Sequence, residues 1–182
     1  SELEKLIKEL RDLVRESEER LRELVRKVKE LIKRSEDEVE RLLDRSRELA
    51  KELEEEIRRK GLEERLLREI EKELRELLKR NRDSLRRLKE LYRELLRRIR
   101  KLLEDIRRKY EEVLRRLEEA PDRREVLDKL KKDAKRVNDD SERIIKRADE
   151  EVKRVNEESK RMLEENEKMN RDLVRRIRER IK

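Results

Sequence analysis

Apolar residues recur along this chain with a period of eighteen residues. In residues 1–60 the positions Leu3, Leu6, Ile7, Leu10, Leu13 and Val14 return as Leu21, Leu24, Val25, Val28, Leu31 and Ile32. Residues 62–120 and 122–182 show the same period. Eighteen residues make five turns of an undistorted α-helix, whereas seven-residue repeats drive a left-handed supercoil. The repeat therefore predicts long α-helices with almost no supercoil.

The width of the apolar stripe indicates how many neighbours each helix has. The stripe positions cover about 120° of the helix surface, at about 100° per residue. A stripe of that width faces two neighbouring helices, which suits a three-helix bundle better than a two-stranded seam. The fold class predicted is all-α, with three long antiparallel helices, up-down-up, in a near-untwisted coiled-coil-like bundle.

The single glycine and the single proline mark where the helices should end. Gly61 and Pro121 divide the chain into three segments of almost equal length. Continuing the first stripe through Gly61 would place the next core positions about 100° away from those found, so the first helix cannot run on. We expect one three-helix bundle over residues 1–182, with helices at about 2–60, 62–119 and 122–181. Short connections make successive helices antiparallel.

Capping patterns support these boundaries. Ser1 and Glu4 form a capping-box pattern at the start of the first segment. Asp122 and Glu125 form the same pattern at the start of the third segment. Gly61 suits the left-handed position that follows a helix, and Leu62 suits the apolar contact that accompanies it.

The composition gives a resemblance to a class of proteins. Charged residues make up 60% of the chain and aromatic residues 1%, with no Trp or Phe. Natural three-helix repeats of the spectrin kind usually carry Trp and other aromatics, and their heptads are less regular. Regular caps, minimal loops, Leu/Glu/Lys/Arg filling and unbroken periodicity match design heuristics. Over its whole length the chain resembles de novo designed helical bundles, and the resemblance implies a structural scaffold with no natural biochemical activity.

Polar side chains interrupt the apolar stripe at coherent positions, and we predict that they form a structural polar core. A buried amide or hydroxyl without a partner costs roughly 1–3 kcal/mol, so matched polar layers would fix the helix register. Solvent-wetted edges and a polar ligand pocket are the alternative interpretations. The predicted core residues are Ser17, Ser35, Ser46, Asn81, Ser84, Tyr92, Tyr110, Asn138, Ser141, Asn156, Ser159, Asn166 and Asn170.

The spacing of these residues predicts which of them share a layer. Ser1 and Asp122 differ by 121 residues, and so do two pairs of stripe residues. These pairs are Ser17 with Asn138, and Ser35 with Asn156. Helical side chains lean toward the N-terminus, so the Tyr110 hydroxyl should reach the first pair and the Tyr92 hydroxyl the second. Two further groups are expected: Ser46 with Asn166 and Asn170, and Asn81 and Ser84 with Ser159.

The residues that are absent exclude several kinds of site. The chain has no His and no Cys, which removes the usual general base, thiol nucleophile and zinc ligands. One Gly cannot make a Gly-rich phosphate loop. The carboxylates alternate with Lys and Arg, as on a solvated helix surface. We therefore predict no enzymatic activity and no catalytic, cofactor-binding or metal-binding residue.

One stretch of the chain is strongly basic. Residues 79–101 contain eleven Lys or Arg and three Asp or Glu, within a chain of net charge +8. The acidic stretch Glu36–Glu56 would oppose it in an antiparallel hairpin, so complementarity between helices is the simpler interpretation and a nucleic-acid partner is not expected. No apolar run exceeds two residues, so neither a membrane span nor a targeting signal is predicted and no compartment can be assigned.

Two functional interpretations remain open from the sequence. The first is a monomeric scaffold, which needs no partner. The second is a designed binding or assembly module, which forms a homo-oligomer or accepts a partner helix. The third segment has the most polar stripe, so a partner would most readily contact it.

Overall fold

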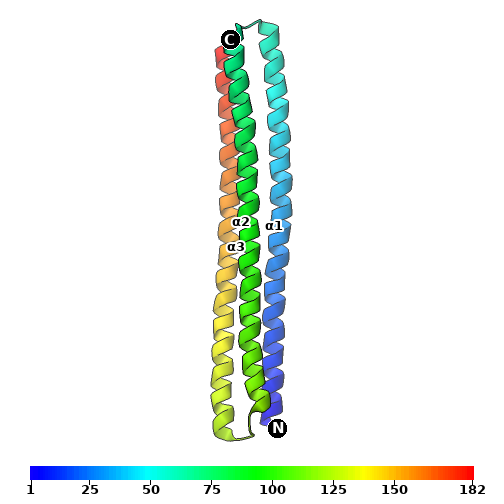
Figure 1. The fold of residues 1–182 in the computed structure, drawn as a ribbon, viewed down its shortest axis with the longest axis vertical. Helices are drawn as coiled ribbons and strands as arrows, with labels where there is room; N and C mark the ends of the chain where they lie inside the picture. The colour runs from blue at the N-terminus through cyan, green and yellow to red at the C-terminus, as the bar shows by residue number, and fades with distance from the viewer. The chain divides into compact units, whose positions relative to one another are not determined.

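The computed structural model describes residues 1–182 and contains three α-helices and no strand (Figure 1). They are α1 (Glu2–Lys60), α2 (Glu64–Glu119) and α3 (Arg124–Ile181), with 59, 56 and 58 residues. The helices pack against each other, which confirms the predicted all-α three-helix fold. None of them has a stretch apolar and long enough to cross a bilayer.

The packing of the chain divides it into two compact units. Unit 1 contains Ser1–Glu30 and Arg93–Arg154, and unit 2 contains Leu31–Tyr92 and Val155–Lys182. Each unit therefore includes a segment of all three helices. The expectation of a single bundle over residues 1–182 stays a prediction.

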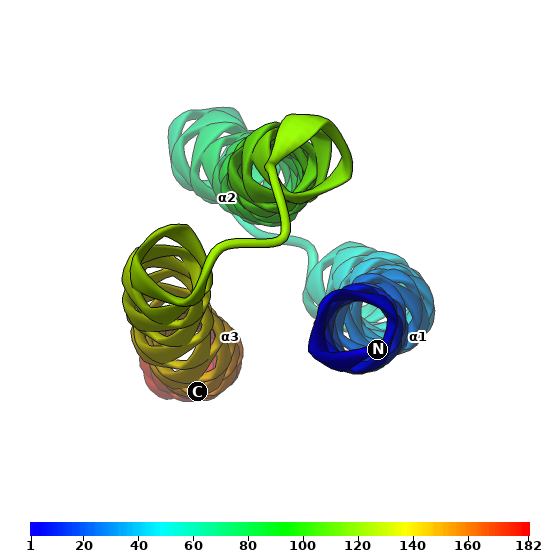
Figure 2. The same ribbon diagram turned by 90° about the horizontal axis from the view of Figure 1, so that it is seen from below.

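In unit 1 the helix directions follow from contacts between side chains. Arg11 contacts Glu118 at 3.2 Å and Glu18 contacts Arg107 at 2.9 Å, so α1 and α2 are antiparallel. Figure 2, viewed from the end of the chain that belongs to this unit, shows the three helices at the corners of a triangle. The buried apolar side chains between them are Leu6, Leu10, Leu21, Leu24 and Val28 of α1, Leu95, Ile99, Ile106, Val113 and Leu117 of α2, and Leu127, Leu130, Ala134, Ile145, Ala148 and Val152 of α3.

In unit 2, α1 and α3 run in the same direction. Ser46 contacts Asn170, and fourteen residues further along α1 the Lys60 Nζ donates to the Ile181 carbonyl at 2.8 Å. One apolar cluster joins the three helices here. Its buried members are Ala50, Leu53 and Ile57 of α1, Ile70 and Leu74 of α2, and Val174, Ile177 and Ile181 of α3.

The first connection follows the predicted capping chemistry. The Gly61 backbone has φ of 59°, the only positive φ in the chain, and its N–H donates to the Arg58 carbonyl at 3.4 Å. Leu62 packs on the apolar cluster of unit 2. The next helix begins at Glu64, two residues later than predicted, because Leu62 and Glu63 complete the turn. At the start of α1 the Glu4 N–H donates to Ser1 Oγ at 3.3 Å.

The second connection corrects one predicted boundary. The Arg123 N–H donates to the Pro121 carbonyl at 2.8 Å, which places Asp122 inside a bend. The first backbone bond of α3 then joins the Leu127 N–H to the Arg123 carbonyl at 3.0 Å. Since α3 begins at Arg124, the N-cap position falls to Arg123 and not to Asp122.

Candidate functional site: two buried polar layers

A polar layer in unit 1 takes one side chain from each helix. Tyr110 of α2 is fully buried, and its hydroxyl donates to Asn138 Oδ1 of α3 at 3.2 Å. The same hydroxyl lies 3.4 Å from Ser17 Oγ of α1. Because a phenol has one proton and Asn138 receives it, Ser17 donates to the Tyr110 oxygen. This is the grouping that the residue spacing predicted for Tyr110.

A second polar layer, in unit 2, also joins all three helices. The Ser46 hydroxyl of α1 donates to the Leu42 carbonyl at 2.7 Å and accepts hydrogen bonds from Asn81 Nδ2 and Asn170 Nδ2, both at 3.0 Å. Asn81 Nδ2 also lies within donating distance of Asn170 Oδ1, at 3.3 Å. Ser46 thereby uses its proton and both lone pairs. All three layer residues are buried, which makes Ser46 the centre of a satisfied network.

The predicted grouping of Asn81 and Ser84 with Ser159 was wrong. Asn81 contacts Asn170, and Ser84 Oγ donates to Asn166 Oδ1 at 3.2 Å. An advance of three residues along α2, from Asn81 to Ser84, therefore corresponds to a step back of four residues along α3, from Asn170 to Asn166. Ser159 lies seven residues before Asn166. The expected grouping of Ser46 with Asn170 is confirmed by their hydrogen bond, whereas Asn166 bonds to Ser84 of α2 and not to Ser46.

Tyr92 does not form the layer expected of it. Its side chain is only 1% exposed, and its hydroxyl has no hydrogen-bond partner. Ser35 is buried and Asn156 is half-buried, but neither bonds to the Tyr92 hydroxyl. The spacing that placed Tyr110 correctly therefore did not predict the hydrogen bonding of Tyr92.

The remaining polar-core residues lie within α3. Ser141 is fully buried and donates to the Val137 carbonyl of its own helix at 2.8 Å. Ser159 is 2% exposed. The hydroxyl of Ser141 bonds to its own helix and to no residue of another helix, so Ser141 does not link the helices.

The two layers contain no chemistry for bond breaking. Their side chains are hydroxyls and amides, without a base beside a nucleophile. No group of three or more Asp or Glu is placed to hold a metal ion. What these side chains do is form hydrogen bonds between the three helices of their unit.

The ionic interactions lie on the surfaces of the units. In unit 1 a hydrogen bond from Arg107 to Glu18 raises the pKa of that guanidinium. Hydrogen bonds to Glu151 and Glu94 likewise raise the pKa of Arg98. Both groups are charged at any physiological pH, so these shifts indicate surface pairing and not an acid or base of a reaction.

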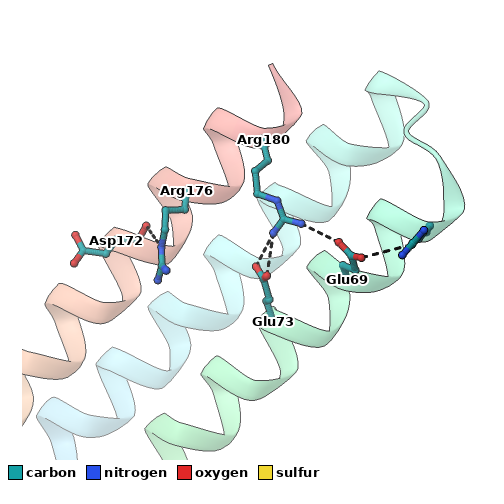
Figure 3. A network of polar contacts seen from close by, with 6 residues as sticks. Glu69, Glu73, Asp172, Arg176 and Arg180 are labelled. Atoms are coloured by element: carbon teal, nitrogen blue, oxygen red, sulfur yellow. Dashed lines mark hydrogen bonds and ion pairs between the residues drawn. The ribbon is translucent and has the colours of Figure 1, made fainter.

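The residue spacing did not predict an ionic cluster between α2 and α3 in unit 2. Arg180 Nη1 contacts both carboxylate oxygens of Glu73, at 2.9 and 3.1 Å, and Nη2 contacts Glu69 at 3.1 Å (Figure 3). Nearby, Arg176 Nε donates to the Asp172 carbonyl at 3.4 Å. The sequence did contain one indication of this cluster. Glu69 and Glu73 are one turn apart and so present two carboxylates on one face of the helix.

Comparison of the chain with protein-family models, curated proteins and solved structures finds no match in any of the three.

Proposed function

We propose that this chain is a designed structural scaffold whose buried polar layers set the register of its three helices. The observation that carries the proposal is the network centred on Ser46, which binds one amide from each of the other two helices. The layer around Tyr110 likewise contains one residue from each of the three helices. The hydrogen bonds of such a layer form only when all three helices are aligned. Displacing any one helix along its axis would therefore break them.

The energetic reason is the repeat itself. Because each apolar stripe returns every eighteen residues, purely aliphatic layers would tolerate displaced packings. Sliding by one turn, about 5.4 Å, would break the hydrogen bonds of a polar layer and bury their groups unpaired. Each unpaired group costs roughly 1–3 kcal/mol, so the aligned packing is favoured over its neighbours.

The inference of design rests on regularity. The three stripes share one eighteen-residue period, and the one residue with positive φ is the only glycine. Helix ends carry the charges that complement the helix dipole, such as Arg58, Arg59 and Lys60 in the last turn of α1. Agreement between period, caps and turn residues is what design heuristics produce.

The register can be measured by pulsed electron resonance between two spin labels. The chain has no cysteine, so Lys72→Cys and Lys168→Cys, both exposed in unit 2, create unique labelling sites. The test variant removes the layer with Ser46→Ala, Asn81→Leu and Asn170→Leu. We expect one narrow distance distribution before the change, and a broadened or multiple distribution after it.

The control variant carries Asn156→Leu with the same labels, because Asn156 is half-buried and joins neither layer. We expect this variant to keep the narrow distribution. A narrow, unshifted distribution in the variant without the layer would show that aliphatic packing alone sets the register, and the proposal would fail.

A second candidate function is assembly, as a homo-oligomer or with a partner helix. It is favoured by two open grooves between α1 and α3 in unit 1. One is lined by Leu24 and Ile145 among charged residues, and the other by Leu10, Leu13 and Ala134. Light scattering coupled to size exclusion distinguishes the candidates, because a mass near 22.8 kDa supports the monomeric scaffold and a multiple of it supports assembly.

A further inference from the structure

A row of cations lies on one face of α2 within unit 2. Lys79, Arg82, Arg86 and Lys89 follow one another at steps of three, four and three residues, which keeps them on one side of a helix. Lys79, Arg82 and Arg86 are exposed, and Lys89 is half-buried. We call these four residues the basic face.

No carboxylate of the acidic stretch Glu36–Glu56 forms an ion pair with this face, and three of them pair elsewhere. Within the acidic stretch of α1, Asp44 pairs with Arg47 and Glu55 with Arg59, both on α1 itself. Glu56 of the same stretch pairs with Arg178 of α3 at 3.6 Å. None of the four cations of the basic face takes part in an ion pair of the structure. The positive charge of the basic face is therefore not paired with carboxylates of the neighbouring helices.

The stretch that carries the basic face has few opposing charges of its own. Within residues 79–92 the only carboxylates are Asp83 and Glu90, and neither forms an ion pair. Lys and Arg side chains without partners are free to bind an external anion, and the Arg guanidinium matches the geometry of a phosphate. The face is therefore suited to a polyanion with regularly placed phosphates.

The surroundings of the face distinguish among polyanions. Single-stranded nucleic acid is held largely by stacking of bases on aromatic side chains, but Tyr92 and Tyr110 are 1% and 0% exposed. An interfacial membrane helix needs exposed apolar anchors, and the only large apolar side chain that is exposed in the chain is Met169 of α3. Binding to the backbone of a duplex needs neither feature.

We propose that the basic face of α2 binds the phosphate backbone of duplex nucleic acid without reading its base sequence. Such binding consists of phosphate contacts that release counterions, so it weakens steeply as salt is raised. In unit 1, Arg93, Arg97 and Arg100 have similar spacing and also lack ion pairs, so they offer a smaller surface of the same kind. Their neighbour Arg98 does not, because Glu94 and Glu151 hold it.

The test is fluorescence anisotropy of a labelled random-sequence DNA duplex, titrated with the full chain at several salt concentrations. One variant changes every residue of the basic face to Gln. A matched control changes four exposed cations of α1 that also lack ion pairs, so both variants lose the same charge. The control substitutions are Lys5→Gln, Lys8→Gln, Arg15→Gln and Arg26→Gln. Circular dichroism verifies that both variants keep their helices.

We expect the native chain to bind the duplex at low salt and the variant of the basic face to bind at least about tenfold more weakly. Four lost phosphate contacts should also reduce the slope of log affinity against log salt by about 3 to 4. The control should retain most of the affinity and the slope.

Three outcomes would overturn the proposal. The first is no binding of the duplex at low salt. The second is an equal loss in the two variants, which would indicate attraction to net charge alone. The third is binding to vesicles rich in anionic lipid without binding to the duplex, which would assign the face to a membrane surface.

Discussion

The Tyr110 hydroxyl lies 3.4 Å from Ser17 Oγ and donates to Asn138, whereas the Tyr92 hydroxyl, eighteen residues earlier on the same helix, has no partner. The two rings are equally buried, at 0% and 1% exposure. The tyrosines therefore differ in hydrogen bonding and not in the area that they remove from water. This makes them a matched pair for measuring what a satisfied polar layer contributes.

We predict different effects on stability for the same substitution at these two positions. Tyr110→Phe removes a hydroxyl that binds two partners and should lower the free energy of unfolding by about 1–3 kcal/mol, because Ser17 and Asn138 lose a partner. Tyr92→Phe removes an unsatisfied buried hydroxyl and should leave stability unchanged or raise it by about 1 kcal/mol. Urea unfolding followed by circular dichroism measures both. Equal losses at the two sites would contradict the assignment of partners.

The periodicity of the sequence predicted the core well, because the core face of one helix depends only on the angle between successive residues. Leu10, Leu21 and Val28 are on the predicted stripe of α1, and all are essentially buried. Contacts between helices depend also on how far one helix is displaced along the next. The geometry of the connections and the packing set that displacement, which the period does not contain. The error in placing Asn81 and Ser84 near Ser159 was therefore one of axial offset.

Two asparagines of α3 in unit 2 should respond differently to replacement by leucine. Asn170 bonds to Ser46 and contacts Asn81, so Asn170→Leu should cost about 1–3 kcal/mol because each of these buried residues loses one of its hydrogen bonds. Asn156 is half-buried and belongs to neither layer, so Asn156→Leu should leave the melting temperature unchanged or raise it. Thermal unfolding by circular dichroism compares the two variants. A large loss from Asn156→Leu would indicate that this residue has partners of its own.

Gly61 should be sensitive to substitution because of its backbone and not because of its surroundings. A Cβ added at this position would meet no atom within 4 Å, but its φ of 59° is unfavourable for residues with a side chain. Gly61→Ala should therefore lower the free energy of unfolding by about 1–2 kcal/mol. Gly61→Asn is the control, since Asn tolerates the left-handed conformation better, and it should cost less. Chemical unfolding measures both, and equal costs would contradict a backbone origin.

Arg180 should contribute modestly to stability, and its contribution should depend on salt. Its guanidinium contacts Glu73 through two hydrogen bonds and Glu69 through a third, but both carboxylates are partly exposed to solvent. Solvent screening limits such pairs, so Arg180→Gln should cost at most about 1 kcal/mol at low ionic strength and less at 1 M salt. Arg176→Gln is the matched control, because Arg176 bonds only to the Asp172 carbonyl and should show little dependence on salt. Urea unfolding at two salt concentrations measures the difference, and a loss at Arg180 that salt leaves unchanged would point to packing of its aliphatic stem instead of its charge.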